Sequence, residues 1–186
     1  MPRPKLVSDE DVLAAALDTL AEQGMTFTLS DLARRVGLSR ATLIQRFGDR
    51  NAILRHIAEF EFSATRAWIN AYPLETGAEG LWKFLEAIVR GMGGGEGFSA
   101  RVQIAALEVR DPALRALAQE RYQMVQTAIA ERLPEGLPNK ETAAHLHAVI
   151  AGATMQWVVT DRMVDLSEFV LHRLRWAMRN TSPALI

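Results

Sequence analysis

Residues 28–50 contain two short helical patterns separated by a tight turn, and this pairing constrains the fold more than any other stretch. Thr28 or Ser30 can cap the first helix, because a side-chain oxygen there accepts a hydrogen bond from an otherwise unpaired backbone amide. Gly37 tolerates the left-handed conformation that ends many helices, and Ser39 can cap the second helix. We therefore predict a helix-turn-helix over this stretch.

The two predicted helices each have an apolar face and a polar face. Residues at helical spacing form the predicted core, namely Leu29, Leu32, Ala33, Val36, Leu38, Leu43 and Phe47. The outer face of the second helix instead carries long or polar side chains, namely Arg40, Thr42, Gln45 and Arg46. A short helix with outward hydrogen-bond donors fits the major groove of DNA, so the pattern predicts a DNA-binding surface.

The distribution of charge supports this interpretation, although the total does not. A net charge of −1 argues against a protein that coats nucleic acid generally. Between Leu32 and His56, however, six arginines stand against a single acid, Asp49. Positive charge focused on one segment is typical of a protein that touches DNA through one face. The alternative is a solvated surface with ordinary arginines.

The chain as a whole is predicted to be all-α. Helix-forming residues dominate its 186 residues, 49% are hydrophobic, and no alternating strand pattern occurs. The absence of cysteine excludes disulfides, thiolate nucleophiles and cysteine-based zinc sites. We expect no metal, no cofactor and no enzymatic activity, because no catalytic motif is present. No apolar run has the length of a signal peptide or membrane span, so we expect a soluble, cytoplasmic protein.

We predict two domains, a DNA-binding domain over residues 1–48 and a helical ligand-binding and dimerisation domain over residues 49–186. The last two predicted helices, roughly 139–160 and 166–179, are apolar on more than one face. Such helices are either deeply buried or cover a partner, so we expect a homodimer, with a monomer of thick core as the alternative. The candidate interface residues are Leu146, Val149, Ile150, Ala153, Trp157, Val170, Leu174 and Ala177.

A ligand site is predicted less directly, from large and adaptable apolar side chains on the later helices. The candidates are Trp82, Met92, Phe98, Met124, Met155 and Trp157. Because few charges accompany them, we expect an apolar or aromatic effector. The alternative is that these side chains simply fill the core.

The candidate DNA contacts divide into two classes. Contacts to phosphate are predicted for side chains near helix N-termini and for one arginine, namely Thr28, Ser39, Thr42 and Arg50. Contacts to base edges are predicted for Arg40, Ile44, Gln45 and Arg46. Arg3 and Lys5, interleaved with prolines, could form a stiff arm that follows the minor groove, or a solvated tail.

The segment TFTLSDLARRVGLSRATLIQRFGDRNAIL at residues 26–54 resembles the N-terminal signature of the TetR family of bacterial transcriptional regulators. That resemblance implies a homodimeric repressor whose last two helices form a four-helix bundle. It also implies that two N-terminal domains bind a near-palindromic double-stranded operator, and that a small molecule among the C-terminal helices releases the DNA.

The chain departs from the family pattern at two positions. Ile44 stands where the family often has a tyrosine, and Arg50 stands where a lysine is frequent. Ile44 can still touch a thymine methyl group, and Arg50 keeps a donor for phosphate. Three other functions stay open: a regulator of this family controlled by a protein partner, a protein-binding helical scaffold, and an enzyme.

Overall fold

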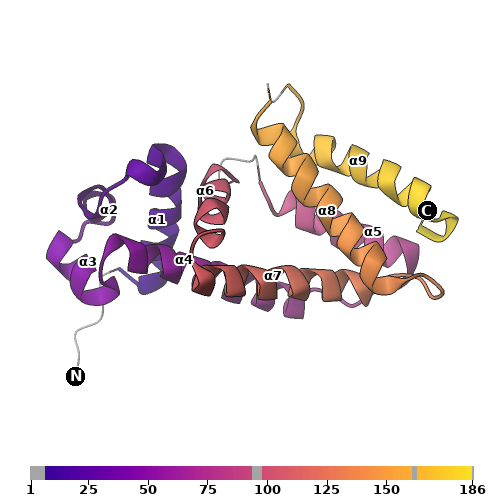
Figure 1. The fold of residues 1–186 in the computed structure, drawn as a ribbon, viewed down its shortest axis with the longest axis horizontal. Coiled ribbons are helices and arrows are strands. Elements are labelled where there is room, and N and C mark those ends of the chain that lie inside the picture. Colours follow the sequence, from indigo (N-terminus) through magenta and orange to yellow (C-terminus); the bar gives the residue numbers. More distant parts are fainter. Residues whose placement is uncertain (1–6, 94–97, 161–162, 186) are drawn as a thin grey trace. The chain divides into compact units, whose positions relative to one another are not determined.

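The structure is a computed structural model that describes residues 7–93, 98–160 and 163–185, and within them it is helical and contains no strand (Figure 1). The predicted all-α fold is therefore confirmed. The helices are α1 (Asp9–Gln23), η1 (Gly24–Thr26), α2 (Leu29–Val36), α3 (Arg40–Phe47), α4 (Arg50–Ala71), α5 (Gly77–Arg90), α6 (Phe98–Glu108), α7 (Pro112–Ala130), α8 (Asn139–Val158), α9 (Leu166–Thr181) and η2 (Pro183–Leu185).

The chain packs into two compact units, of which the first comprises Met1–Ala64 and Gly97–Ala118. The second comprises Thr65–Glu96 and Gln119–Ile186. This division by packing differs from the predicted split between residues 48 and 49, since the first unit includes much of α4 together with α6.

The first unit contains the predicted helix-turn-helix, and its local geometry follows from the caps. The Thr28 hydroxyl accepts a hydrogen bond from the Asp31 amide at 3.2 Å, while the Asp31 carboxylate accepts one from the Thr28 amide at 2.9 Å. Gly37 ends α2 in the left-handed region with φ of 67°. Ser39 then begins α3 by accepting a hydrogen bond from the Thr42 amide at 3.0 Å. The predicted helix-turn-helix is confirmed.

The core of the first unit joins residues that lie far apart in the sequence. Leu32 of α2, Leu43 of α3 and Ile53 of α4 are fully buried in one cluster. Ala100 and Ile104 of α6 complete the same cluster, although they follow the helix-turn-helix by more than fifty residues. Three short helices offer too little apolar surface to form a stable core alone, which explains why α4 and α6 are recruited.

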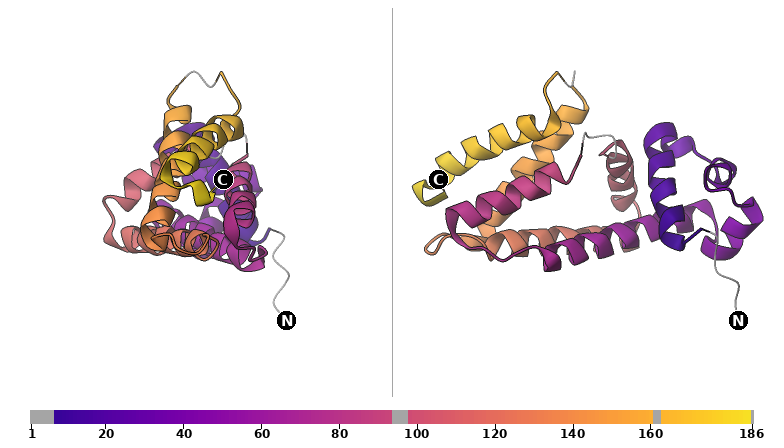
Figure 2. Two further views of the ribbon diagram at one scale, coloured as in Figure 1. Left: turned by 90° about the vertical axis from the view of Figure 1, so that its right-hand side faces the viewer. Right: turned by 180° about the vertical axis from the view of Figure 1, so that it is seen from behind.

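The second unit is organised around α5, α8 and α9. Helices α8 and α9 run side by side in opposite directions, and α5 packs against α9 (Figures 1 and 2). Their inward residues form one buried cluster that includes Leu81, Phe84, Leu146, Ile150 and Leu174. No described helix is both long enough and apolar enough to cross a lipid bilayer.

A buried arginine stabilises the loop that precedes α5. Arg132 is 2% exposed, and its guanidinium lies 3.9 Å from the centre of the Phe84 ring. It donates hydrogen bonds to the carbonyl oxygens of Ala128 at 2.8 Å and Pro73 at 3.0 Å. Burial lowers the pKa of this guanidinium from its ordinary value. Both terminal nitrogens of the guanidinium bond backbone carbonyls, while its buried Nε has no hydrogen-bond partner among the described residues. Because these bonds tie the end of α7 to the loop before α5, we assign Arg132 a structural role.

Candidate functional site

The outer surface of α3 is an exposed stripe of four residues, Arg40, Ala41, Ile44 and Gln45, which we call the α3 stripe. Spacings of one and four residues place them on the same side of the helix. The inner side is held down by Leu43 and Phe47, which are buried in the core of the first unit. Ile44 is 45% exposed, so the α3 stripe includes one large aliphatic side chain.

Four of the six arginines near the motif are paired with acids within the first unit, and two of these four lie on α2. Arg34 lies 3.3 Å from Asp31, one turn away on α2. Arg35 reaches back to α1, where it bonds Glu22 at 2.7 Å and Asp18 at 3.3 Å. Both side chains therefore already have acidic partners on α1 or α2.

Arg46 is also committed, although its sequence position suggested a base contact. Its Nε donates a hydrogen bond to the Asp9 carboxylate at 2.9 Å, and a second guanidinium nitrogen contacts the same oxygen. Its side chain is only 13% exposed and lies over the Phe47 ring. Arg46 is therefore not part of the α3 stripe, because its bond to Asp9 of α1 holds the side chain beside α3.

Of the remaining three arginines, two also have a partner in the described part of the first unit and one does not. Arg55 pairs with Asp111 at 3.6 Å. Arg50 donates from Nε to the Phe27 carbonyl oxygen at 3.0 Å, and its guanidinium lies 4.7 Å from the centre of the Phe27 ring. Among the described residues, Arg40 has neither an acidic nor a backbone partner. Sequence reasoning could not separate the paired arginines from Arg40, because several of the pairs join residues far apart in the chain.

The predicted phosphate contacts lie at the starts of helices. Thr28 and Ser39 are exposed N-caps of α2 and α3, where unpaired amides and the helix dipole favour an anion. The Thr28 hydroxyl donates to Asp31 at 2.6 Å, and this bond lowers the pKa of the Asp31 carboxyl. Thr42 lies 2.8 Å from the Ser39 hydroxyl oxygen. The predicted arm residues Arg3 and Lys5 fall outside the described residues.

A family comparison decides how this domain is classified. Residues 12–57 match the family of bacterial regulatory proteins called the tetR family. Residues 12–57 are therefore similar to the N-terminal domain of TetR-family regulators. The resemblance expected from residues 26–54 is confirmed. No curated protein sequence matches the chain.

Solved structures share the fold of nearly the whole chain. A transcriptional regulator from Rhodococcus sp. Rha1 superimposes with a TM-score of 0.80 at 16% identity, covering 94% of this chain and 96% of that one. A proposed transcriptional regulator from Saccharomonospora viridis in complex with choline gives 0.71 at 21% identity, with coverages of 91% and 94%. FadR from Bacillus subtilis in complex with stearoyl-CoA gives 0.68 at 18% identity, with coverages of 91% and 97%.

In the second unit, three of the residues predicted to bind a ligand belong to or pack against one buried cluster, namely Trp82, Met92 and Trp157. Trp82 lines a pocket between α5 and α9, whereas Trp157 is buried and donates from Nε1 to the Val164 carbonyl oxygen at 2.7 Å. Met92 packs on the core beside Thr154, and Met155 is exposed on α8. Met124 is half-buried, and the side chain of Phe98 falls outside the description.

The residues predicted for a dimer interface lie in the interior of a single chain. Val149 is half-buried, and the other seven are buried in the cluster of the second unit or beside it, namely Leu146, Ile150, Ala153, Trp157, Val170, Leu174 and Ala177. A dimer would therefore need other residues. Sequence periodicity finds the apolar face of a helix but does not tell whether its own chain or a partner covers it.

The outward side of α8 offers such residues. Ala148, Gly152, Met155 and Val159 lie on it at helical spacing and are exposed, and we call them the α8 stripe. Val159 is 73% exposed at the end of this row, and Trp176 of α9 is 66% exposed. A Cβ built on Gly152 meets no atom within 4 Å. Within the described part of the chain, nothing therefore requires glycine at this position.

The two histidines of α8 differ in environment. His145 is exposed, whereas His147 is largely buried, with its ring centre 5.0 Å from that of Tyr122. Burial, aided by the positive charge of Arg121, lowers the pKa of His147 to about 4. No group of three potential metal-binding side chains occurs among the described residues.

Proposed function

We propose that this chain is a DNA-binding transcriptional regulator that reads DNA with the α3 stripe. The observation that carries the proposal is the contrast among the arginines of the helix-turn-helix region. Five of them are bonded to acids or to a backbone carbonyl, while Arg40 is presented outward on the second helix. A lone cation on an exposed helix is suited to contact with a base edge in the major groove.

Each exposed position has a chemical partner in this proposal. Arg40 can bond guanine O6 and N7 in a bidentate fashion, and Gln45 can pair with adenine. Ile44 provides an apolar contact for a thymine methyl group. Thr28, Ser39 and Thr42 contact phosphates near helix N-termini, and we retain Arg50 as a phosphate contact.

Arg46 has a different role in this account. Its bond to Asp9 fixes α3 against α1, so it orients the reading helix rather than reading a base itself. A positioning contact of this kind limits how far α3 can rotate when it enters the groove.

Selection of DNA from a random pool tests the proposal, because no operator needs to be known beforehand. We expect the protein to enrich a near-palindromic sequence, and its affinity for that sequence to fall linearly on a log–log plot against salt. Recovery of unrelated sequences with no common pattern would contradict specific reading. Absence of any salt-dependent DNA binding would contradict the proposal as a whole.

We further propose that the protein acts as a homodimer through the outward side of α8 together with Trp176 of α9. Small residues let two helices approach closely, and the exposed apolar side chains gain by burial. Gly152 supports this assignment, since glycine within a helix costs about 1 kcal/mol relative to alanine and no contact among the described residues requires it. Two reading helices on one dimer provide the contacts that one short helix lacks.

Replacement of Gly152 by leucine tests the dimer without disturbing the core. We expect Gly152→Leu to raise the dissociation constant of the dimer by at least about tenfold, measured by sedimentation equilibrium, while the helix content stays that of the wild type. Lys140→Leu is the matched control, because Lys140 is exposed on the first turn of α8, about three turns away from Gly152. A wild-type monomer, or a Gly152→Leu dimer of unchanged affinity, would contradict the assignment.

Repression and release by a small apolar or aromatic effector complete the proposal. The support comes from structurally similar proteins, one in complex with choline and one in complex with stearoyl-CoA. An effector that binds the free protein more tightly than the DNA-bound protein must lower DNA affinity by the same factor. A screen for ligands that raise the melting temperature tests this part. Failure to find one would favour control by a protein partner.

A further inference from the structure

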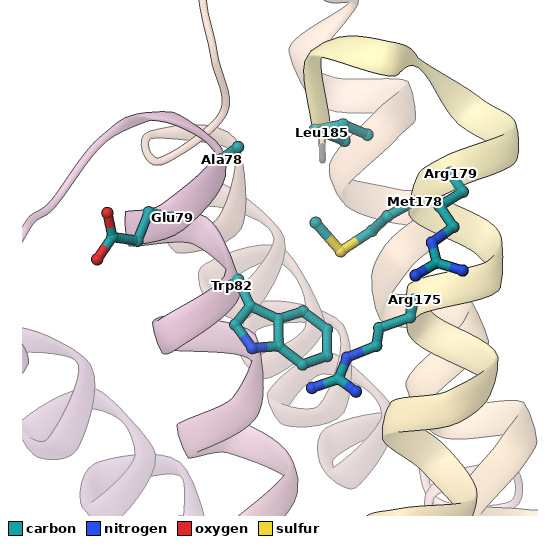
Figure 3. A pocket seen from close by; sticks show the side chains of 7 residues that line it. All are labelled: Ala78, Glu79, Trp82, Arg175, Met178, Arg179 and Leu185. Carbon is teal, nitrogen blue, oxygen red and sulfur yellow. The ribbon is translucent and has the colours of Figure 1, made fainter.

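A pocket of about 410 Å³ lies between the first turns of α5 and the last turns of α9, with η2 beside it (Figure 3). Its apolar lining comes from Ala78, Trp82, Met178 and Leu185. Leu185 is 2% exposed, because η2 turns back and packs on both helices. The volume lies within the range of pockets that hold small molecules.

Two arginines face this apolar lining from the same helix. Arg175 and Arg179 are one turn apart on α9 and both line the pocket. The Arg175 guanidinium lies 4.6 Å from the centre of the Trp82 ring, which holds it across the opening. Within the described part of the chain, neither arginine has an acidic partner. Like charges one turn apart disfavour a helix, so an anion placed between them is favoured.

The acidic side chain at the edge of the pocket does not balance this charge. Glu79 pairs with Lys83 at 3.0 Å, an interaction between successive turns of α5. In Figure 3 its carboxylate points away from Arg175 and Arg179. The pocket therefore combines positive charge on one side with an apolar lining.

We propose that this pocket binds a small organic carboxylate that has an apolar, ring-sized body. The carboxylate accepts hydrogen bonds from Arg175 and Arg179, which donate in a planar, directional geometry suited to two oxygens. The apolar body packs on Trp82, Met178 and Leu185. This site differs from the purely apolar one expected from the sequence, because charge selects the ligand. The proposal concerns binding alone and stands independently of any DNA-binding activity.

Calorimetric titration with naphthalene-2-carboxylate tests the site. We expect this anion to bind the full chain, and its neutral analogue naphthalene-2-methanol to bind at least about tenfold more weakly, since a charge-assisted hydrogen bond is lost. In the double variant Arg175→Gln/Arg179→Gln, the affinity for the anion should fall to that for the alcohol. Both arginines are exposed, so these changes leave the core intact.

Arg173→Gln is the matched control on the same helix. Arg173 also lies over an aromatic ring, that of Phe169 at 3.2 Å, but it does not line the pocket. We expect its replacement to leave the affinity for the anion unchanged. Three results would overturn the proposal: equal affinity for anion and alcohol, an equal loss in Arg173→Gln, or no binding of the anion at about 1 mM. None of these measurements involves DNA.

Discussion

The outward sides of α3 and α8 are both exposed, yet their chemistry is opposite. The α3 stripe presents Arg40 and Gln45 around a single large aliphatic residue, Ile44. The α8 stripe presents small and apolar residues without a charge, among them Gly152 and Met155. A polar, cationic helix gains by contacting a charged polymer with hydrogen-bonding edges, whereas a small apolar helix gains by close packing against another protein surface.

The difference teaches that exposure alone does not identify a partner. In the first unit the decisive information is which charges are already bonded, because this singles out Arg40. In the second unit it is which residue lacks an internal explanation, because this singles out Gly152. Each of the two stripes is therefore identified by a residue whose role the single chain does not explain: Arg40 on α3 and Gly152 on α8.

The largest expected effect distinguishes the two sides of α3. Leu43→Ala should lower the free energy of unfolding by roughly 2–5 kcal/mol, because a fully buried leucine leaves a cavity. Ile44→Ala, one residue along, should change it by less than about 0.5 kcal/mol. Denaturant titration of both variants measures the contrast. Similar losses would mean that Ile44 belongs to the core and that the α3 stripe is misassigned.

A pH titration distinguishes the inner flank of α8 from its outward side. The pKa of His147 is about 4 in the folded protein, below the ordinary value of 6.5. Between these values the unfolded chain binds a proton that the folded chain excludes, so stability falls as the pH falls. The loss begins below about pH 6.5 and reaches about 3 kcal/mol near pH 4.

His147→Phe should remove this part of the pH dependence while keeping a ring beside Tyr122. His145→Phe is the control, since His145 is exposed and meets water in both states. Unfolding measured between pH 7 and pH 4 would show the wild-type profile in the control and a flatter profile in His147→Phe. Identical profiles in all three proteins would refute the burial of His147.

The smallest expected effect concerns a phosphate contact at the start of α4. Arg50→Ala should weaken binding to all DNA sequences and make the log–log salt dependence shallower by about one unit. Because Arg50 also bonds the Phe27 carbonyl, thermal unfolding of the variant must be measured alongside. An unchanged slope of the salt dependence would mean that Arg50 only stabilises the segment at Phe27 and does not contact DNA.

Much of the first unit could be predicted because its signals are local. The caps at Thr28 and Ser39 act over three residues, and the stop at Gly37 depends on one backbone conformation. The pairing of Arg46 with Asp9 spans thirty-seven residues, so no local pattern contains it. The same holds for Ile104, whose place in the core depends on tertiary packing.

The second unit could be predicted only in outline. The sequence indicated that the last two helices have more than one apolar face, which Met155 and Trp176 bear out by their exposure. It did not indicate which face of α8 is interior, because both faces carry apolar side chains. Leu146 lies on the buried face and Met155 on the exposed one. The pocket at Trp82 was missed apart from that residue, since Arg175 and Leu185 join it only through the fold.

The central claim is that α3 reads DNA with Arg40, and binding of paired arginine variants tests it most directly. Arg40→Ala should lose discrimination at one base pair of the selected site by roughly 1–3 kcal/mol. Arg34→Ala, which removes an exposed arginine paired with Asp31, should keep it. Affinities for the selected site and for a single-base variant, measured at one salt concentration, give the comparison. Full discrimination by Arg40→Ala would contradict the account.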